Sequence, residues 1–250
     1  MKIEATVIEE AGFLPAIYGL GLSYGLTNNI PYKEFIKDKE LINRLSNVAV
    51  KLSTKDGGHN KFLESIKIYL VVNAPRFWWS EADTYRLSTK QSASTMHTLV
   101  KEVKVFSEDI RKFFSNGMNF EYNPLWCAKK AMREEVWDKI RAYVNSNFDI
   151  NNSPDAEQAC VDQVFRMAFE AAYCKDECEL LIFCKGNLPE SYMQKREWCI
   201  DYKTFRNINM QRFNHRLPHW KSFLEQVNNQ LSHKELISRD IKAFGGVSVK

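Results

Sequence analysis

The chain has 250 residues, of which 44% are hydrophobic, 13% aromatic and 26% charged, so we expect one large domain over 1–250 and exclude a disordered chain. Its 35 basic and 31 acidic residues give a net charge of +4 without a long run of like charges. Nucleic acid is therefore not an expected partner, whereas an anion pocket is compatible with the charge. The sequence contains no long apolar stretch and no signal peptide, so we expect a soluble cytoplasmic protein that does not bind a membrane.

The first part of the chain predicts a strand, a helical region and a second strand. Ile3 to Ile8 alternates weakly between apolar and polar residues, as in a strand. Tyr32 to Leu52 has apolar residues at near-helical spacing, and Gly57-Gly58 then breaks the chain. A helical turn from His59 to Ser65 leads into Ile66 to Val72, whose β-branched and aromatic residues predict a buried strand.

The next segment predicts a helix followed by a polar loop. Pro75 ends the second strand, and Phe77 to Arg86 is interpreted as a helix. Ser88 to His97 is interpreted as a loop, because it combines hydroxyl groups, a lysine and a histidine between two apolar segments.

The last part of the chain predicts mainly helices. Ser153-Pro154-Asp155 is a typical helix start, and Val161 to Ala172 then forms one apolar face. Leu180 to Cys184 suits either a strand or the end of a helix. Tyr202 to Leu231 is predicted to be helical with a break at Pro218. Because helices outnumber strands and do not alternate with them, we predict an α+β fold with a mixed sheet and long helices rather than a doubly wound parallel sheet.

The first candidate site is the segment from Gly58 to Glu64. Gly57 and Gly58 let the backbone approach a ligand, and His59 and Glu64 follow on one short helix. Taken alone, this pattern favours a helix cap with a surface histidine, because glycine pairs mostly make turns.

The second candidate site is the segment from Arg86 to His97. Hydroxyl groups, backbone amides and cations are the groups that bind a phosphate. A solvated loop explains the same composition, so the segment alone does not decide between the two.

The third candidate site combines Lys185 to Pro189 with a later group of polar residues, which are Arg206, Asn207, Arg212, Asn214, His215, Arg216 and His219. We interpret the arginines and asparagines as one helical face suited to an anion or a planar amide edge. Metal sites are not expected. His215 and His219 have Pro218 between them and no nearby carboxylate motif, and Cys174, Cys178 and Cys184 lack the spacing of zinc ligands. The cysteines are expected to be reduced, because the sequence shows no export signal.

The order of these clusters resembles that of the flavin-dependent thymidylate synthases. That family has Gly-His-x-Ser-x-x-Glu-His, then Arg-His-Arg-x-x-Ser-x-Asn-x-x-Ser-x-Arg-Tyr, then Arg-x-x-Leu-Pro and an Asn-x-x-x-x-Arg helix. The similarity covers roughly 57–97 and 184–227, and 98–180 has no assigned counterpart. The matching residues here are Gly58, His59, Glu64, Arg86, Thr89, Gln91, Ser94, Lys185, Leu188, Pro189, Asn207 and Arg212.

The signature departs from the family at both ends. Thr84-Tyr85 stand where the family has Arg-His, and Met96-His97 stand where it has Arg-Tyr. Lost cations weaken an anion site, and Lys90 and His97 are the residues able to compensate. Loops ending in Ser-x-Met-His are similar to those of phage proteins related to this family.

The resemblance implies a role for each matched residue. Arg212 would polarise the pyrimidine as the catalytic residue, and the nucleotide is of the deoxyuridine monophosphate type. FAD would be the cofactor, with methylenetetrahydrofolate and NADPH as co-substrates, and the family implies a homotetramer with sites between subunits. The residues implied to bind FAD are His59, Glu64, Arg86 and Asn207, and those implied to bind the nucleotide are Thr89, Lys90, Gln91, Ser94, His97 and Lys185.

Two alternatives stay open. The same fold can bind a nucleotide without catalysis, and the lost cations favour that interpretation. An enzyme that modifies a different pyrimidine nucleotide would keep the flavin and change the carbon donor. A protein that retains flavin would separate both enzyme interpretations from the binding protein.

Overall fold

A computed structural model describes residues 2–55, 58–93, 95–114, 124–173 and 176–237. The chain divides into two compact units. Unit 1 comprises Met1–Lys2, Ala74–Glu81 and Ser92–Gln194, and unit 2 comprises Ile3–Asn73, Ala82–Gln91 and Lys195–Lys250. Neither unit forms from one continuous segment, and a single domain over 1–250 stays a prediction.

A four-stranded sheet in the order β1-β2-β4-β3 is the centre of unit 2. Its strands are β1 (Glu4–Ala11), β2 (Lys67–Pro75), β4 (Met193–Asp201) and β3 (Ser88–Ser92). β1 runs antiparallel to β2 with Val7 opposite Leu70, and the register shifts between Val7 and Glu9. Buried and half-buried residues alternate along β2, so one face of this strand packs against the core.

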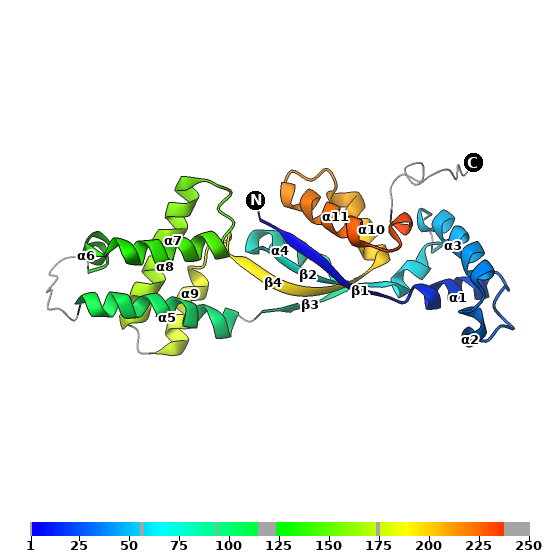
Figure 1. Ribbon diagram of the computed structural model, residues 1–250, viewed down its shortest axis with the longest axis horizontal. Helices are drawn as coiled ribbons and strands as arrows, with labels where there is room; N and C mark the ends of the chain where they lie inside the picture. Colours follow the sequence, from blue (N-terminus) through cyan, green and yellow to red (C-terminus); the bar gives the residue numbers. More distant parts are fainter. Residues whose placement is uncertain (1, 56–57, 94, 115–123, 174–175, 238–250) are drawn as a thin grey trace. The chain divides into compact units, whose positions relative to one another are not determined.

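Two helices cover one face of this sheet (Figure 1). They are α10 (Tyr202–Arg212) and α11 (Pro218–Gln230), and Pro218 lies in the first turn of α11. The predicted break at Pro218 is therefore confirmed, because proline is tolerated in a first turn but not inside a helix. The core beneath the helices is aromatic, with Trp198, Trp220 and Phe223 all 0% exposed.

Helix α11 also satisfies the backbone of the edge strand β1. The Gln226 amide accepts from Ala5 N at 2.9 Å and donates to Ile3 O at 3.1 Å. Gln230, one turn later, accepts from Val7 N at 2.9 Å and donates to Ala5 O at 2.9 Å. These two side chains bond to backbone N–H and C=O groups that a further strand would otherwise pair, since the backbone of an edge strand is unpaired on one side.

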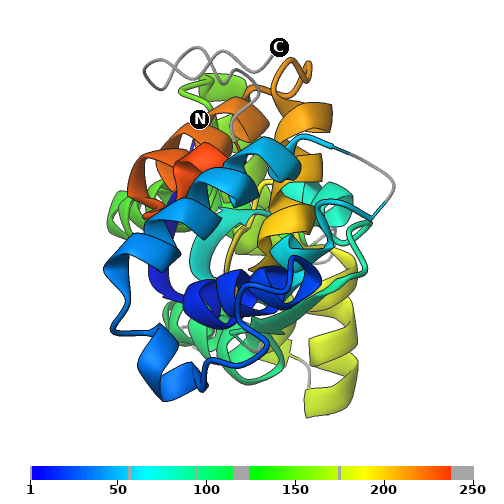
Figure 2. The same cartoon turned by 90° about the vertical axis from the view of Figure 1, so that its right-hand side faces the viewer.

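A helical layer follows β1 in unit 2. It contains α1 (Phe13–Ser23), α2 (Tyr32–Phe35), α3 (Lys39–Ser53) and the 3-10 helix η1 (Lys61–Ser65). Figure 2 shows α1 and α3 from their outer side, and both α3 and η1 contact α1. Gly12 joins β1 to α1 with φ at +90°, and a Cβ atom there would lie 2.2 Å from Ser65 O. Only glycine combines this backbone conformation with so close an approach to η1.

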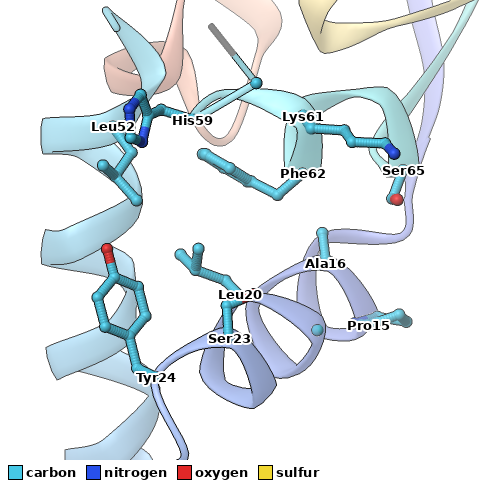
Figure 3. Close-up of a pocket in the computed structure, with 12 residues that line it drawn as sticks. Pro15, Ala16, Leu20, Ser23, Tyr24, Leu52, His59, Lys61, Phe62 and Ser65 are labelled. Carbon is cyan, nitrogen blue, oxygen red and sulfur yellow. The ribbon is translucent and has the colours of Figure 1, made fainter.

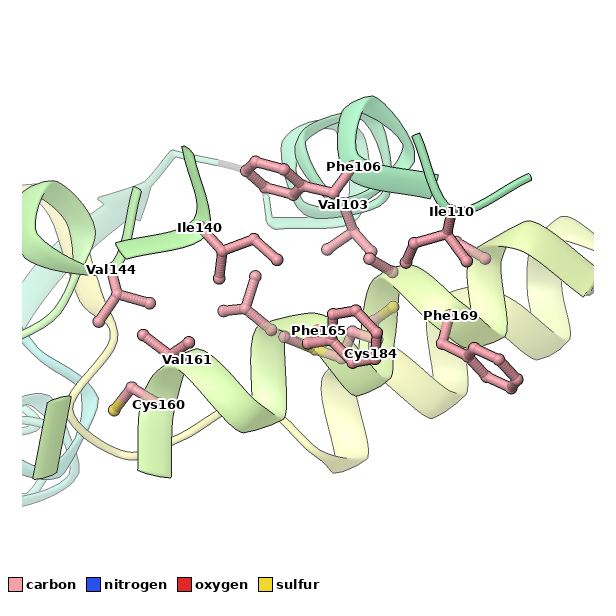
Figure 4. Packing of buried hydrophobic residues seen from close by; sticks show 14 of the residues in the cluster. Val103, Phe106, Ile110, Ile140, Val144, Cys160, Val161, Phe165, Phe169 and Cys184 are labelled. Carbon is pink, nitrogen blue, oxygen red and sulfur yellow. The ribbon is translucent and has the colours of Figure 1, made fainter. Parts of the chain in front are cut away.

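Unit 1 is mainly a bundle of helices. Its elements are α4 (Arg76–Ala82, whose last residue belongs to unit 2), α5 (Thr95–Phe114), α6 (Pro124–Ala131), α7 (Glu134–Asn147), α8 (Pro154–Tyr173) and α9 (Glu177–Gly186). Helix α8 packs against α5, α7 and α9 around a shared apolar core (Figure 4). Phe165 is 1% exposed in this core and stacks on Trp137 with ring centroids 4.7 Å apart. The predicted helix start at Ser153-Pro154 is confirmed.

The structure corrects three assignments made from sequence. Residues 88–92 form β3 and residues 95–97 begin α5, so they are not a loop, because an exposed edge strand has no apolar alternation to reveal it. The helical region 32–52 is two helices with a break between Phe35 and Lys39. The helix predicted over 77–86 ends at Ala82. Of the two alternatives for residues 180–184, the helix is confirmed, because these residues belong to α9.

None of the helices among the described residues combines the length and hydrophobicity of a membrane span. Helix η2 (Lys234–Leu236) is the last element of the described chain.

Candidate functional site

A cavity of about 600 Å³ lies between α1, the end of α3 and η1, and we call it the η1 cavity. Leu20 and Leu52 are nearly buried, and together with Phe62 and Tyr24 they face a shared space (Figure 3). Exposed polar side chains complete the lining, and these are Ser23, His59, Lys61 and Ser65. The cavity thus offers an apolar surface for a ring system with hydrogen-bonding groups at its edge, which is the usual composition of a ligand pocket.

The turn before η1 positions His59 at this cavity. Gly58 has φ at +89°, and Lys61 N donates to Gly58 O at 3.1 Å, which closes the turn. His59 is exposed and lines the cavity together with Leu52 (Figure 3). Gly57 lies outside the described residues.

Glu64, predicted to bind the cofactor, is exposed and forms an ion pair within the protein. Its carboxylate accepts from Lys203 Nζ of α10 at 2.6 Å. This hydrogen bond lowers the pKa of Glu64, with smaller contributions from the charges of Lys203, Lys61 and Lys67. Glu64 therefore ties η1 to α10 and does not line the η1 cavity.

A second cavity of about 440 Å³ lies where β2 begins and β4 ends, and we call it the strand-end cavity. Two of its lining residues, Arg86 and Thr89, were predicted from the sequence as site residues. Two others, Lys67 and Asp201, were not. Lys67 Nζ is 3.7 Å from an Asp201 carboxylate oxygen, whereas Arg86 has no ion-pair partner within the described part of the chain. The lining therefore carries one more positive than negative charge, and an anion would be attracted to it.

Lys90 of β3 points its ammonium group into the protein. The nitrogen lies 3.5 Å from Asp83 Oδ1, 3.3 Å from Tyr85 O and 4.9 Å from the centre of the Trp198 ring. Burial lowers the pKa of Lys90, and the Asp83 carboxylate opposes that shift. In this arrangement Lys90 braces the turn before β3, and its predicted contact with a nucleotide would require it to leave these partners.

Arg212, the predicted catalytic residue, ends α10 among three side chains. Its Nε donates to Tyr85 Oη at 2.9 Å, and its Nη1 lies 2.8 Å from His215 Nε2. The guanidinium carbon lies 5.0 Å from the centre of the Trp220 ring, within the range of a cation–π interaction. Tyr85 and Trp220 were not predicted as site residues, although Tyr85 marked a departure from the signature, whereas His215 belongs to the third candidate cluster.

The remaining predicted residues have the following positions. Asn207 is exposed on α10 and Gln91 is exposed on β3, both in unit 2. Lys185 is exposed in the last turn of α9, in unit 1. His97 lies in the first turn of α5, and Ser94 is outside the described residues.

The interpretation of α10 as one Arg/Asn face was wrong. Arg206 is 8% exposed, whereas the adjacent Asn207 is exposed. Asn214 and Arg216 follow the end of α10 at Arg212, so they do not extend a helical face. Among the described residues, no three His, Cys, Asp or Glu side chains are close enough to form a metal site.

Comparison with solved structures shows the same fold in flavin-dependent thymidylate synthases. A Helicobacter pylori enzyme of this kind, complexed with FAD and dUMP, is 12% identical in sequence with a TM-score of 0.66, over 94% of this chain and 97% of the other. A second structure from that organism, also with FAD and dUMP, gives 12% identity and a TM-score of 0.65 over 94% and 96%. No protein-family model and no curated protein matches the chain.

The likeness spans nearly the whole of both chains, so it includes the helical bundle that the sequence left unassigned. The chain has the fold of a flavin-dependent thymidylate synthase with a strongly divergent sequence, and the α+β prediction is confirmed.

Proposed function

We propose that this chain binds FAD and a pyrimidine nucleotide of the deoxyuridine monophosphate type in unit 2, and that it methylates the nucleotide. The observation that carries the proposal is the strand-end cavity, where Arg86 and Thr89 supply a cation and a hydroxyl beside Lys67. Both neighbouring structures of this fold contain FAD and dUMP. A phosphate or an acidic pyrimidine edge is the kind of group that such a lining attracts.

The two cavities suit an extended dinucleotide. Ser65 borders the η1 cavity and Lys67 borders the strand-end cavity, so their walls are two residues apart in the chain. The apolar surface of the η1 cavity fits one ring system of FAD, with His59 and Lys61 available to its polar groups. Arg86 would contact the cofactor from the strand-end cavity. Asn207 and Glu64 are the other residues proposed to hold FAD, Glu64 through its bond to Lys203.

The nucleotide would be bound by Thr89, Gln91 and Arg212, with Lys90 as a further contact in unit 2. The contacts predicted for His97 and Lys185, which belong to unit 1, and for Ser94, which lies outside the described residues, stay predictions. The Arg212 guanidinium can stabilise negative charge that develops on the pyrimidine carbonyl. Flavin supplies the hydride when it is bound, methylenetetrahydrofolate is the proposed carbon donor and NADPH the proposed reductant. The homotetramer and the cytoplasmic location implied by the resemblance stay predictions.

One observation favours nucleotide binding without catalysis. The Arg212 guanidinium is bonded to Tyr85 and His215, and the Lys90 ammonium is bonded to Asp83 and Tyr85, so both cations have partners within the protein. Formation of thymidylate from deoxyuridine monophosphate, methylenetetrahydrofolate and NADPH distinguishes the two functions. Product above the no-enzyme control supports the enzyme, and nucleotide binding without product supports the binding protein.

The flavin part of the proposal is tested by the visible absorption of purified protein after addition of FAD and desalting. We expect flavin bands to remain with wild-type protein. Phe62→Asp, which places a charge in the apolar wall of the η1 cavity, is expected to lose them, whereas exposed Lys221→Ala on α11 keeps them. Wild-type protein that retains no flavin would reject the proposed cofactor.

A further inference from the structure

We propose that Tyr85 is a positioning residue, which holds the Arg212 guanidinium in the orientation needed to bind the nucleotide. This inference rests on the proposed function, because it assumes that Arg212 contacts the nucleotide. Tyr85 stands where the related family has histidine, so the arrangement is a property of this chain's own sequence.

The hydroxyl of Tyr85 has a defined role as donor and acceptor. It donates to Gln211 Oε1 at 3.1 Å, since an amide oxygen can only accept. It accepts from Arg212 Nε at 2.9 Å, since a guanidinium can only donate. The three side chains therefore form one directed chain of hydrogen bonds, from Arg212 through Tyr85 to Gln211.

Aromatic rings hold the same guanidinium from a second direction. The Arg212 guanidinium carbon lies 5.0 Å from the centre of the Trp220 ring and 5.8 Å from that of Tyr85. The two rings contact each other edge to face, with centroids 6.0 Å apart and an angle of 75° between their planes. Trp220 is 0% exposed and is itself packed against Phe223, so this side of the arrangement is anchored in the core.

A long, flexible arginine loses rotamer entropy when it binds a ligand, and prior ordering removes part of that cost. The Tyr85 hydroxyl should therefore raise nucleotide affinity without touching the nucleotide.

The test is a titration of deoxyuridine monophosphate into FAD-loaded protein, with Tyr85→Phe as the main variant. Phenylalanine keeps the ring contact with Trp220 and removes only the hydroxyl. We expect about tenfold weaker binding from the loss of one charge-assisted hydrogen bond. Tyr18→Phe is the matched control, because the Tyr18 hydroxyl donates to Ile30 O at 2.9 Å elsewhere in unit 2. It is expected to leave the affinity unchanged.

A double-mutant cycle separates positioning from a general structural effect. If Tyr85 acts through Arg212, then Tyr85→Phe should have no effect on residual binding in an Arg212→Lys background. Wild-type affinity in Tyr85→Phe, or an equal loss in both backgrounds, would overturn the inference. Wild-type protein that binds no deoxyuridine monophosphate would overturn the proposed function itself, and the inference with it.

Discussion

The turn between β1 and α1 gives the most direct test of how tightly the wall of the η1 cavity is constrained. At Gly12, φ is +90° and an added Cβ would lie 2.2 Å from Ser65 O, which is a backbone atom and not a flexible side-chain end. An alanine in a left-handed conformation costs about 1–2 kcal/mol. Moving the η1 backbone to relieve the clash costs about 1–3 kcal/mol more, as other overpacked sites do. We therefore expect Gly12→Ala to lower the free energy of unfolding by about 3 kcal/mol.

Urea unfolding followed by circular dichroism measures this change. The matched control is Gly19→Ala in α1, where a Cβ would meet no atom within 4 Å. Alanine has the higher helix propensity, so Gly19→Ala is expected to raise the free energy of unfolding by about 0.5–1 kcal/mol. Glycine to alanine should thus lower the free energy of unfolding at one position and raise it at another position seven residues away. Equal stability of Gly12→Ala and wild-type protein would refute the reasoning about Ser65.

Three further substitutions test the packing of each unit. Phe165→Ala empties a position that is 1% exposed in the unit 1 core, and calorimetry should show a loss of about 3–5 kcal/mol. Burial raises the pKa of Tyr192 to about 12, so its stabilising contribution is full below pH 10 and is lost as the pH rises towards 12. The urea midpoint of wild-type protein should fall between pH 10 and pH 12, and it should fall less in Tyr192→Phe. An equal fall in both proteins would contradict the raised pKa of Tyr192. Gln230→Ala removes two hydrogen bonds to β1 and should lower the free energy of unfolding by about 1 kcal/mol. It should also increase self-association in sedimentation, because it leaves the edge of β1 unpaired. Lys221→Ala on the same helix should have neither effect.

The apolar pattern predicted the elements that bury one clear face. The helix from Pro154 follows from its capping serine, its proline and the apolar residues that pack on α5. The break at Pro218 follows from the missing backbone donor of proline. These signals are local, so one sequence is enough to read them.

Strand β4 could not be predicted in this way. Its segment Met193 to Asp201 contains Lys195, Arg196 and Glu197, which are unusual in a central strand. Arg196 is accommodated because Asp83, far away in sequence, lies 3.0 Å from it. A strand whose charges are satisfied by tertiary partners gives no local signal.

Only part of the candidate site was predicted, because its other residues meet only through tertiary contacts. The sequence singled out Arg86 and Thr89, which line one cavity, and His59, which lines another. It missed Lys67 and Asp201, because the ends of β2 and β4 meet only in the folded sheet. The hydrogen bond between Tyr85 and Arg212 joins residues 127 positions apart, so sequence spacing could not reveal it.

The central claim is that the strand-end cavity binds the flavin cofactor, with Arg86 as its contact. It is tested most directly by isothermal titration of FAD into wild-type protein and Arg86→Ala. We expect saturable binding by wild-type protein and a large loss of affinity in Arg86→Ala, with urea midpoints that agree because Arg86 is exposed. Equal affinity of the two proteins would contradict the assignment of the cofactor to this cavity.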